Sequence, residues 1–247
     1  MERIVAGGYP EAQNLSDRMR GIWFEGYVER LLRRDTQDLR VRIPETRLIA
    51  ILRLLAANQA GELVKARLGR DGGIPETSVP TTLDVLSALY LTTALPPWTP
   101  NLTSREVSRP KMIVLDSGMA AYLSRLSPQA LADPLRGEHL GPLLEGFVAA
   151  ELLKQRSWSQ TPYEVFHWRD RDGKEVDLLL QLPDGGIIAI EVKAAAAVNA
   201  KHFAGLRTLR EKLGDRFLAG FVVHLGSRGF SFGDRLGSLP LDGLWRH

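Results

Sequence analysis

Three charged residues in the C-terminal third of the chain interrupt apolar stretches that are typical of buried strands. Asp177 precedes three leucines, and Glu191 and Lys193 break a run of Ile, Ala and Val. Burying such charges without compensation is expensive. Residues two apart in a strand face the same side, so Glu191 and Lys193 share one face. If Asp177 lies on the neighbouring strand of a hairpin, one cluster holds two carboxylates and an ammonium group.

This cluster has the donor set for metal-assisted hydrolysis of a phosphodiester. Two carboxylates and a backbone carbonyl, which we assign to Val192, would hold Mg²⁺ or Mn²⁺ and leave positions for water and a phosphate oxygen. Lys193 would orient the attacking water or stabilise the charge that develops on the phosphate. Glu145, on a preceding helix, is expected as a further ligand. The predicted catalytic residues are therefore Asp177, Glu191 and Lys193.

The cluster also has a purely structural interpretation. Lys193 could form an ion pair with Asp177 or Glu191 in a domain that only binds DNA or a partner. Since all four positions carry residue types suited to catalysis, we favour the metal site. The chain has no cysteine, so any metal must be held by oxygen or imidazole. The histidines show no ligand spacing, and we interpret them as surface or half-buried side chains: His139, His167, His202 and His224.

Hydrophobic periodicity predicts the elements that must position the cluster. The predicted order is helix, three strands, helix and strand, over residues 141–155, 163–169, 174–182, 187–194, 199–213 and 217–225. The first two strands are joined by a tight turn, so they form a hairpin. This αβββαβ order places the three charged residues on consecutive strands.

The preceding part of the chain is predicted to be mainly helical. Residues 17–38 predict a helix with apolar residues at helical spacing, namely Met19, Ile22, Trp23, Tyr27 and Leu31. Residues 44–126 predict three short helices, a turn at PPWTPN (Pro96 to Asn101) and a strand at 111–116, the order of a winged helix-turn-helix. The third of these helices starts at a Ser-Val-Pro sequence and has as its predicted core face Leu83, Leu86, Leu89 and Tyr90.

A DNA-reading role of that third helix competes with a role in packing or oligomerisation. No lysine or arginine occurs between Arg70 and Arg105, so the helix would offer phosphates only neutral or repulsive contacts. Charge therefore favours packing. The net charge of +3 permits nucleic-acid binding without arguing for it. The longest apolar runs are too short to span a bilayer, so we expect no membrane association and a cytoplasmic location.

The cluster resembles the active site of the PD-(D/E)XK nuclease superfamily. Asp177, thirteen further residues and then Glu191-Val192-Lys193 match its motif, and Glu145 is similar to the helical glutamate of archaeal Holliday-junction resolvases. Nearly the whole chain also resembles a C-terminal domain of unknown function of bacterial and archaeal AAA-type ATPases. The matching pieces are GGYPEA, YVERLLRRDTQDL, LPPW, RPKMIVLDSGMAAYL, GPLLEGFVAAEL, WRDRDGKEVDLLL and IEVKA.

These resemblances imply an α/β (α+β) chain in three segments. Residues 1–43 would be an N-terminal linker and helix, 44–126 a winged-helix-like domain, and 127–247 a restriction-endonuclease-like αβββαβ domain. An AAA-type ATPase is the implied partner. No ATP site is expected in this chain itself, because its one Gly-Lys pair is followed by Glu175 rather than Ser or Thr.

Two functions follow as expectations. The first is Mg²⁺- or Mn²⁺-dependent hydrolysis of DNA, or binding of DNA, by a nuclease-like module that accompanies an ATPase. The second is a non-catalytic module that docks an ATPase or forms a homo-oligomer.

Overall fold

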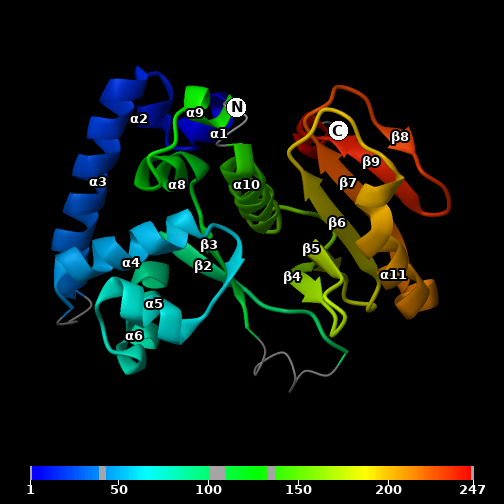
Figure 1. The fold of residues 1–247 in the computed structure, drawn as a ribbon, viewed down its shortest axis with the longest axis horizontal. Coiled ribbons are helices and arrows are strands. Elements are labelled where there is room, and N and C mark those ends of the chain that lie inside the picture. Colours follow the sequence, from blue (N-terminus) through cyan, green and yellow to red (C-terminus); the bar gives the residue numbers. More distant parts are fainter. Residues whose placement is uncertain (1, 39–42, 101–108, 133–136, 246–247) are drawn as a thin grey trace. The chain divides into compact units, whose positions relative to one another are not determined.

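The computed structural model describes residues 2–38, 43–100, 109–132 and 137–245, which form a mixed α/β chain (Figure 1). The chain divides into two compact units. The first unit comprises residues 1–94 and 111–150, and the second comprises residues 95–110 and 151–247. Residues 127–150, which we grouped with the nuclease-like segment, lie in the first unit. In the described part of the chain, no helix has the length and apolar character that crossing a membrane requires.

The first unit is mostly helical. Its elements are α1 (Glu2–Ala6), α2 (Pro10–Gln13), α3 (Asp17–Asp38), α4 (Glu45–Ala57), β1 (Gly61–Glu62), α5 (Lys65–Gly72), the 3-10 helix η1 (Glu76–Ser78), α6 (Val79–Ala88), β2 (Thr92–Leu95), β3 (Lys111–Val114), α8 (Ser117–Leu123), α9 (Pro128–Ala132), η2 (Gly137–His139) and α10 (Leu140–Gln155). The division between the units at Ala150 falls within α10.

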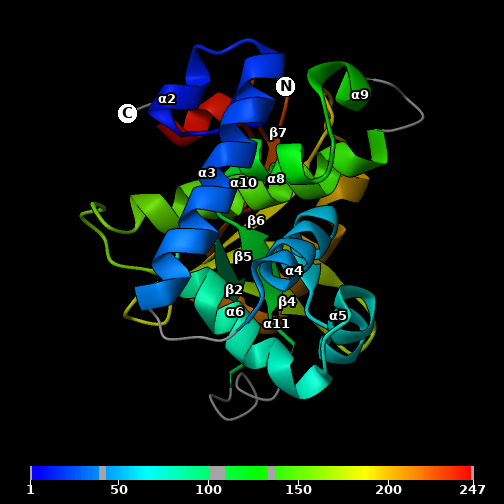
Figure 2. The same cartoon turned by 90° about the vertical axis from the view of Figure 1, so that its left-hand side faces the viewer.

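Helices α4, α5 and α6 pack together beside a small sheet, and Figure 2 shows the three as neighbours. The sheet has the order β1-β3-β2, with Gly61 of β1 opposite Met112 of β3. Helix α4 buries its apolar stripe as the periodicity predicts, through Leu48, Ile51, Leu52 and Leu55. The predicted sequence of three helices followed by a strand at 111–116 is therefore present.

Two predicted apolar faces in this unit are right only in part, although Leu83 and Leu86 are buried as predicted. Helix α3 buries Phe24, Val28 and Leu32, whereas Met19 and Ile22 are exposed. These three buried residues are spaced four apart, so they form the side of α3 that packs against the rest of its unit. In the third short helix, Tyr90 is exposed because α6 ends at Ala88 and Tyr90 takes a positive φ that turns the chain away.

The second unit is built on a six-stranded mixed sheet. Its elements are β4 (Glu164–Arg169), β5 (Glu175–Gln181), β6 (Ile187–Lys193), η3 (Ala200–Phe203), α11 (Ala204–Leu213), η4 (Gly214–Arg216), β7 (Phe217–His224), β8 (Phe230–Ser231), β9 (Leu236–Pro240) and η5 (Leu241–Trp245). The strand order is β4-β5-β6-β7-β9-β8, antiparallel from β4 to β6, parallel from β6 to β9 and antiparallel at β8. The predicted strands and helices of this region are confirmed, whereas β8, β9 and η5 carry no prediction.

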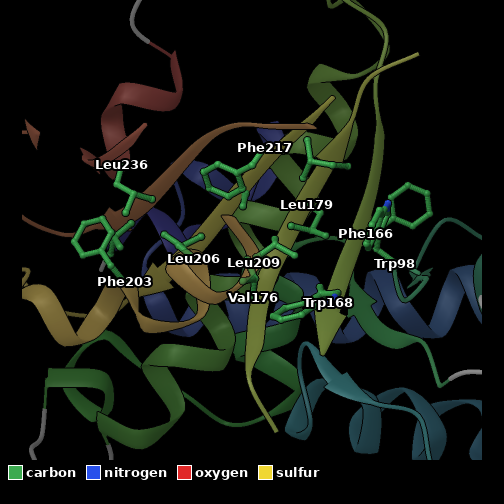
Figure 3. Close-up of a cluster of buried hydrophobic side chains, with 13 residues drawn as sticks. Trp98, Phe166, Trp168, Val176, Leu179, Phe203, Leu206, Leu209, Phe217 and Leu236 are labelled. Carbon is green, nitrogen blue, oxygen red and sulfur yellow. The ribbon is translucent and has the colours of Figure 1, made fainter. Parts of the chain in front are cut away.

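One hydrophobic cluster holds this unit together (Figure 3). Helix α11 contributes Leu206 and Leu209 from its inward side, and Phe203 precedes them. They pack with apolar residues of the sheet, among them Val176, Leu179, Ile187, Ala189, Phe217, Val222 and Leu236. Helix α11 covers this face of the sheet. The charged residues of β6 lie on the same face as Ile187 and Ala189, which is apolar over most of its length.

The segment predicted as a turn at Pro96 to Asn101 behaves differently. Pro97 pairs with His167 of β4 in a parallel bridge, and the backbone of Trp98 donates to the carbonyl of His167 at 2.6 Å. The indole of Trp98 is buried and donates to Gln181 at 2.9 Å. Residues 96–98 therefore extend the sheet at its β4 edge, while Asn101 lies outside the described residues.

Candidate functional site

A β-bulge in β5 determines where Asp177 points. Phe166 of β4 pairs with Leu179, but Trp168, two residues on, pairs with Val176, three residues back. Strand β5 therefore has one extra residue here, at Asp177 and the leucine that follows it. Bulges bend a strand and re-aim its side chains, and they are frequent beside active sites. The bulge frees Asp177 from the regular alternation of the strand.

The freed carboxylate of Asp177 reaches β6. The register of β5 and β6 pairs Leu178 with Ile190, and one further step would bring Asp177 opposite Glu191. At that step the Asp177 carboxylate oxygen Oδ2 accepts a hydrogen bond from the backbone N–H of Val192 at 2.8 Å. Asp177 and Glu191 are both buried. The structure thus brings together the two carboxylates and Val192, as the sequence predicts.

Lys193 completes this cluster from the same face of β6. Its ammonium Nζ donates to Glu191 Oε1 at 2.6 Å. The Lys193 side chain remains about one-third exposed, whereas Glu191 as a residue is 8% exposed. The ion pair leaves the second carboxylate oxygen, Glu191 Oε2, buried and without a hydrogen-bond partner among the residues that the structure describes.

Glu191 has a strongly perturbed acidity. Its pKa is raised from 4.5 to about 7, mainly by burial and in smaller part by the negative charge of Asp177. Lys193 acts in the opposite direction through its charge and its hydrogen bond. Desolvation therefore outweighs the ion pair, and a divalent cation that neutralised both carboxylates would relieve this cost.

Glu145 lies in the first unit, on α10. Its carboxylate accepts a hydrogen bond from the ammonium of Lys111, at the start of β3, and both side chains are largely buried. The role of Glu145 as a further metal ligand stays a prediction. The partner Lys111 was visible in the sequence only as a cation at the start of a predicted strand.

Sequence reasoning missed His224, the last residue of β7. We expected surface or half-buried histidines, but His224 is 2% exposed and His167 is buried as well. His224 is the register partner of Lys193 across the parallel strands β6 and β7, so the two side chains lie side by side. Burial lowers the pKa of His224, against a smaller opposing effect of the Arg228 backbone. Its position at the end of an apolar strand, level with Lys193, was the available signal.

His202 and His167 make local structural contacts. His202 and Asn199 form a capping box at the start of η3, which leads into α11. The Nε2 atom of His167 lies 3.2 Å from the carbonyl of Arg109.

The residues at the cluster fit a hard divalent cation. They offer carboxylate oxygens, which Mg²⁺ and Mn²⁺ prefer, and one of these oxygens is buried without a partner. Within the described ranges, no three or more His, Asp or Glu side chains gather as a metal-binding group. Two carboxylates with a backbone carbonyl and water match the way Mg²⁺ is usually bound, with few protein ligands.

The chain is similar to two curated proteins and to two family models. It is 27% identical over 240 residues to an uncharacterized protein of Mycobacterium bovis and, equally, to an uncharacterized protein of Mycobacterium tuberculosis. Each alignment covers 96% of this chain and 52% of the relative, so the chain spans about half the length of the curated relatives it matches. No solved structure matches the chain significantly.

Two families of unknown function match successive parts of the chain. Residues 140–244 match the domain of unknown function DUF4143, a domain usually found with AAA ATPases. Residues 1–130 match the domain of unknown function DUF8612. Because this second match covers more than half of the chain, the protein belongs to the DUF8612 family.

Proposed function

We propose that the second unit is a nuclease-like module that hydrolyses DNA phosphodiesters with Mg²⁺ or Mn²⁺. The observation that carries this proposal is the convergence of Asp177 and Glu191 from neighbouring strands, with Lys193 beside them and one carboxylate oxygen left without a partner. A buried acidic pair of this kind is costly for a fold that does not use it. The αβββαβ order of elements supports the same PD-(D/E)XK-like interpretation.

In this proposal each residue has a separate task. The carboxylates of Asp177 and Glu191 and the carbonyl of Val192 would hold the cation. When bound, the cation supplies positive charge that polarises a phosphate oxygen and lowers the pKa of a water molecule. Lys193, whose ammonium is partly exposed, orients the attacking water and stabilises negative charge on the phosphate. The hydrogen bond from Val192 N–H to Asp177 keeps the acidic pair in register.

An AAA-type ATPase is the proposed partner of this module. The match to DUF4143 supports this proposal, as do relatives that are about twice as long as the chain. The order α4-β1-α5-α6-β2-β3, with the sheet order β1-β3-β2, supports a winged-helix-like first unit. Its third helix, α6, exposes Asp84 and no cation, so we assign this unit to packing or partner contacts rather than to DNA reading.

The alternative is a non-catalytic module that docks an ATPase or forms a homo-oligomer. The short ion pair between Lys193 and Glu191 favours this alternative, because it already satisfies one carboxylate oxygen without a metal. In such a module Lys193→Ala would leave Glu191 as an unpaired buried charge and destabilise the fold by about 3 kcal/mol. There would be no cleavage to lose.

The two functions are separated by a cleavage assay on the full chain. Branched, single-stranded and duplex DNA are each incubated with Mg²⁺ or Mn²⁺, and the proposal expects cleavage of at least one form. Asp177→Ala should abolish both cleavage and the rise in melting temperature that the cation produces. Asp172→Ala is the matched control, because this carboxylate is exposed at the β4–β5 turn.

Lys193→Ala adds the decisive comparison. A nuclease should lose about 10² or more in cleavage rate while DNA affinity changes by less than about tenfold, since the ammonium acts mainly on the transition state. Wild-type protein that cuts no DNA with either cation, together with a Lys193→Ala variant that melts well below it, would overturn the enzyme and leave the interaction module.

A further inference from the structure

Two buried polar atoms on one face of β6 and β7 are without hydrogen-bond partners in the described part of the chain. They are Glu191 Oε2, an acceptor, and His224 Nε2. A buried polar group that stays unsatisfied costs about 1–3 kcal/mol, so native structures pair such groups with protein or with ordered water. Because the carboxylate oxygen is an acceptor and the ring nitrogen can be a donor, one hydrogen-bonded link between them would satisfy both atoms.

The surroundings of His224 determine which of its nitrogens is the donor. The backbone N–H of Gly226 donates to His224 Nδ1 at 3.0 Å, so Nδ1 carries no proton. The proton of the neutral ring is then on Nε2, which must act as a donor. The turn that makes this bond is tightly packed, because a Cβ atom at Gly226 would collide with the carbonyl of Ala196 in the loop after β6. The backbone thus selects the tautomer.

The register places the donor within reach of the acceptor. Lys193 pairs with His224, and Glu191 pairs with Val222, so Glu191 and His224 are diagonal neighbours on one face. Diagonal neighbours on one face are close enough for one ordered water to bridge their side chains. The hydrogen bond of Lys193 to Glu191 Oε1 leaves Oε2 as the oxygen to be held.

We propose that His224 is a positioning residue for Glu191: its Nε2–H donates through one ordered water to Glu191 Oε2. The proposal rests on the metal site of the proposed function. Hydrogen bonds to a ligating carboxylate fix its orientation, and removing such a bond typically lowers metal affinity 10–100-fold. His224 would then orient Glu191 toward the cation without contacting cation or substrate itself. The backbone of Arg228, whose interaction with the ring raises the pKa of His224, is the competing acceptor for this N–H group.

Two substitutions separate this role from a merely structural one. His224→Asn keeps an acceptor for Gly226 N–H near the position of Nδ1 and lacks the distal donor. His224→Gln restores a donor near the position of Nε2 and lacks the Nδ1 acceptor. The affinity for Mn²⁺ alone is measured by calorimetry on the full chain, and folding is checked by thermal melting. We expect binding at least about tenfold weaker in His224→Asn and near wild type in His224→Gln.

A spectroscopic measurement decides the contact without any metal. The Nε2–H resonance of His224 is followed by NMR at about pH 8, where Glu191 is ionised. A hydrogen bond to a charged acceptor is stronger than one to a neutral acceptor, so Glu191→Gln should move this resonance upfield. Asp172→Asn, at an exposed position, should leave it in place.

The outcomes distinguish the two proposals. An unchanged His224 resonance in Glu191→Gln, or equal Mn²⁺ affinity of wild type and folded His224→Asn, overturns the role of His224 alone. Wild-type protein that binds no Mn²⁺ overturns the metal site, and the resonance then still reports whether His224 holds Glu191. If His224→Asn does not fold, the resonance in Glu191→Gln decides.

Discussion

At the scale of single residues, Glu191 bears most of the electrostatic cost of the site. It is almost fully buried, it lies next to Asp177, and Lys193 compensates only part of the resulting cost. A carboxyl group whose pKa is about 7 exchanges its proton near neutrality, unlike an exposed glutamate. Perturbed groups of this kind gather at functional sites. The site is therefore expected to respond to pH both in stability and in metal affinity.

The stability of the metal-free protein should fall as pH rises from about 4.5 to about 7. The folded state retains a proton on Glu191 over this range, whereas the unfolded state has released it, so protonation favours the fold. Urea unfolding across this range checks the expectation, with Glu191→Gln as the comparison. The variant should lose this part of the pH dependence. An identical pH dependence in both proteins would mean that Glu191 ionises normally.

At the scale of elements, the short segment 96–98 stabilises the second unit from outside the region of its main strands. Trp98 is 3% exposed, belongs to the main hydrophobic cluster and donates its indole N–H to Gln181. Its backbone also extends the sheet beyond β4. A chain that starts at residue 140, where the match to DUF4143 begins, lacks this segment. The folding unit is thus larger than the matched region.

Trp98→Ala should destabilise the second unit by about 3–5 kcal/mol, the usual cost of truncating a buried tryptophan. The matched control is Trp158→Ala, because Trp158 is 67% exposed, and this change should stay within about 0.5 kcal/mol. Chemical unfolding of both variants measures the difference. Equal stability of the two variants would show that segment 96–98 does not support the fold.

At the scale of the whole molecule, the predicted ligands are divided between two units. Asp177, Glu191 and Lys193 belong to the second, whereas Glu145 belongs to the first and pairs with Lys111. A metal held by the second unit alone needs Asp177, Glu191, a backbone carbonyl and water. As a metal ligand, Glu145 would have to give up its ion pair with the Lys111 ammonium. These arrangements predict different patterns of protection when the cation binds.

Hydrogen exchange with and without Mn²⁺ should show slower exchange only in β5 and β6, including the amide of Val192. The reason is that the cation binds the carboxylates of these strands and reduces their local opening. Helices α4, α5 and α6 of the first unit serve as the internal control. Protection that extends to β3 and the middle of α10 would instead show that Glu145 ligates the metal.

The sequence by itself determined the elements of the second unit and the identity of its central charged residues. Alternating and helical periodicities specify β4 to β7 and α11, because burial of one face requires them. A charge in an apolar strand is also visible locally, which is why Asp177, Glu191 and Lys193 could be named. Period-2 geometry predicted that Glu191 and Lys193 share one face, and pairing with a neighbouring strand was expected to bring Asp177 near them.

Only the tertiary structure decided the features that depend on contacts between distant segments. No local pattern reveals the bulge that aims Asp177 at Val192, the bridge of segment 96–98 to β4 or the pairing of Glu145 with Lys111. Helix α3 shows the same limit, since two apolar stripes were available and packing selected Phe24 over Met19. His224 became significant only through its register with Lys193. The physical reason is that register, burial and ion pairing are properties of neighbours in space, which a pattern along the chain does not specify.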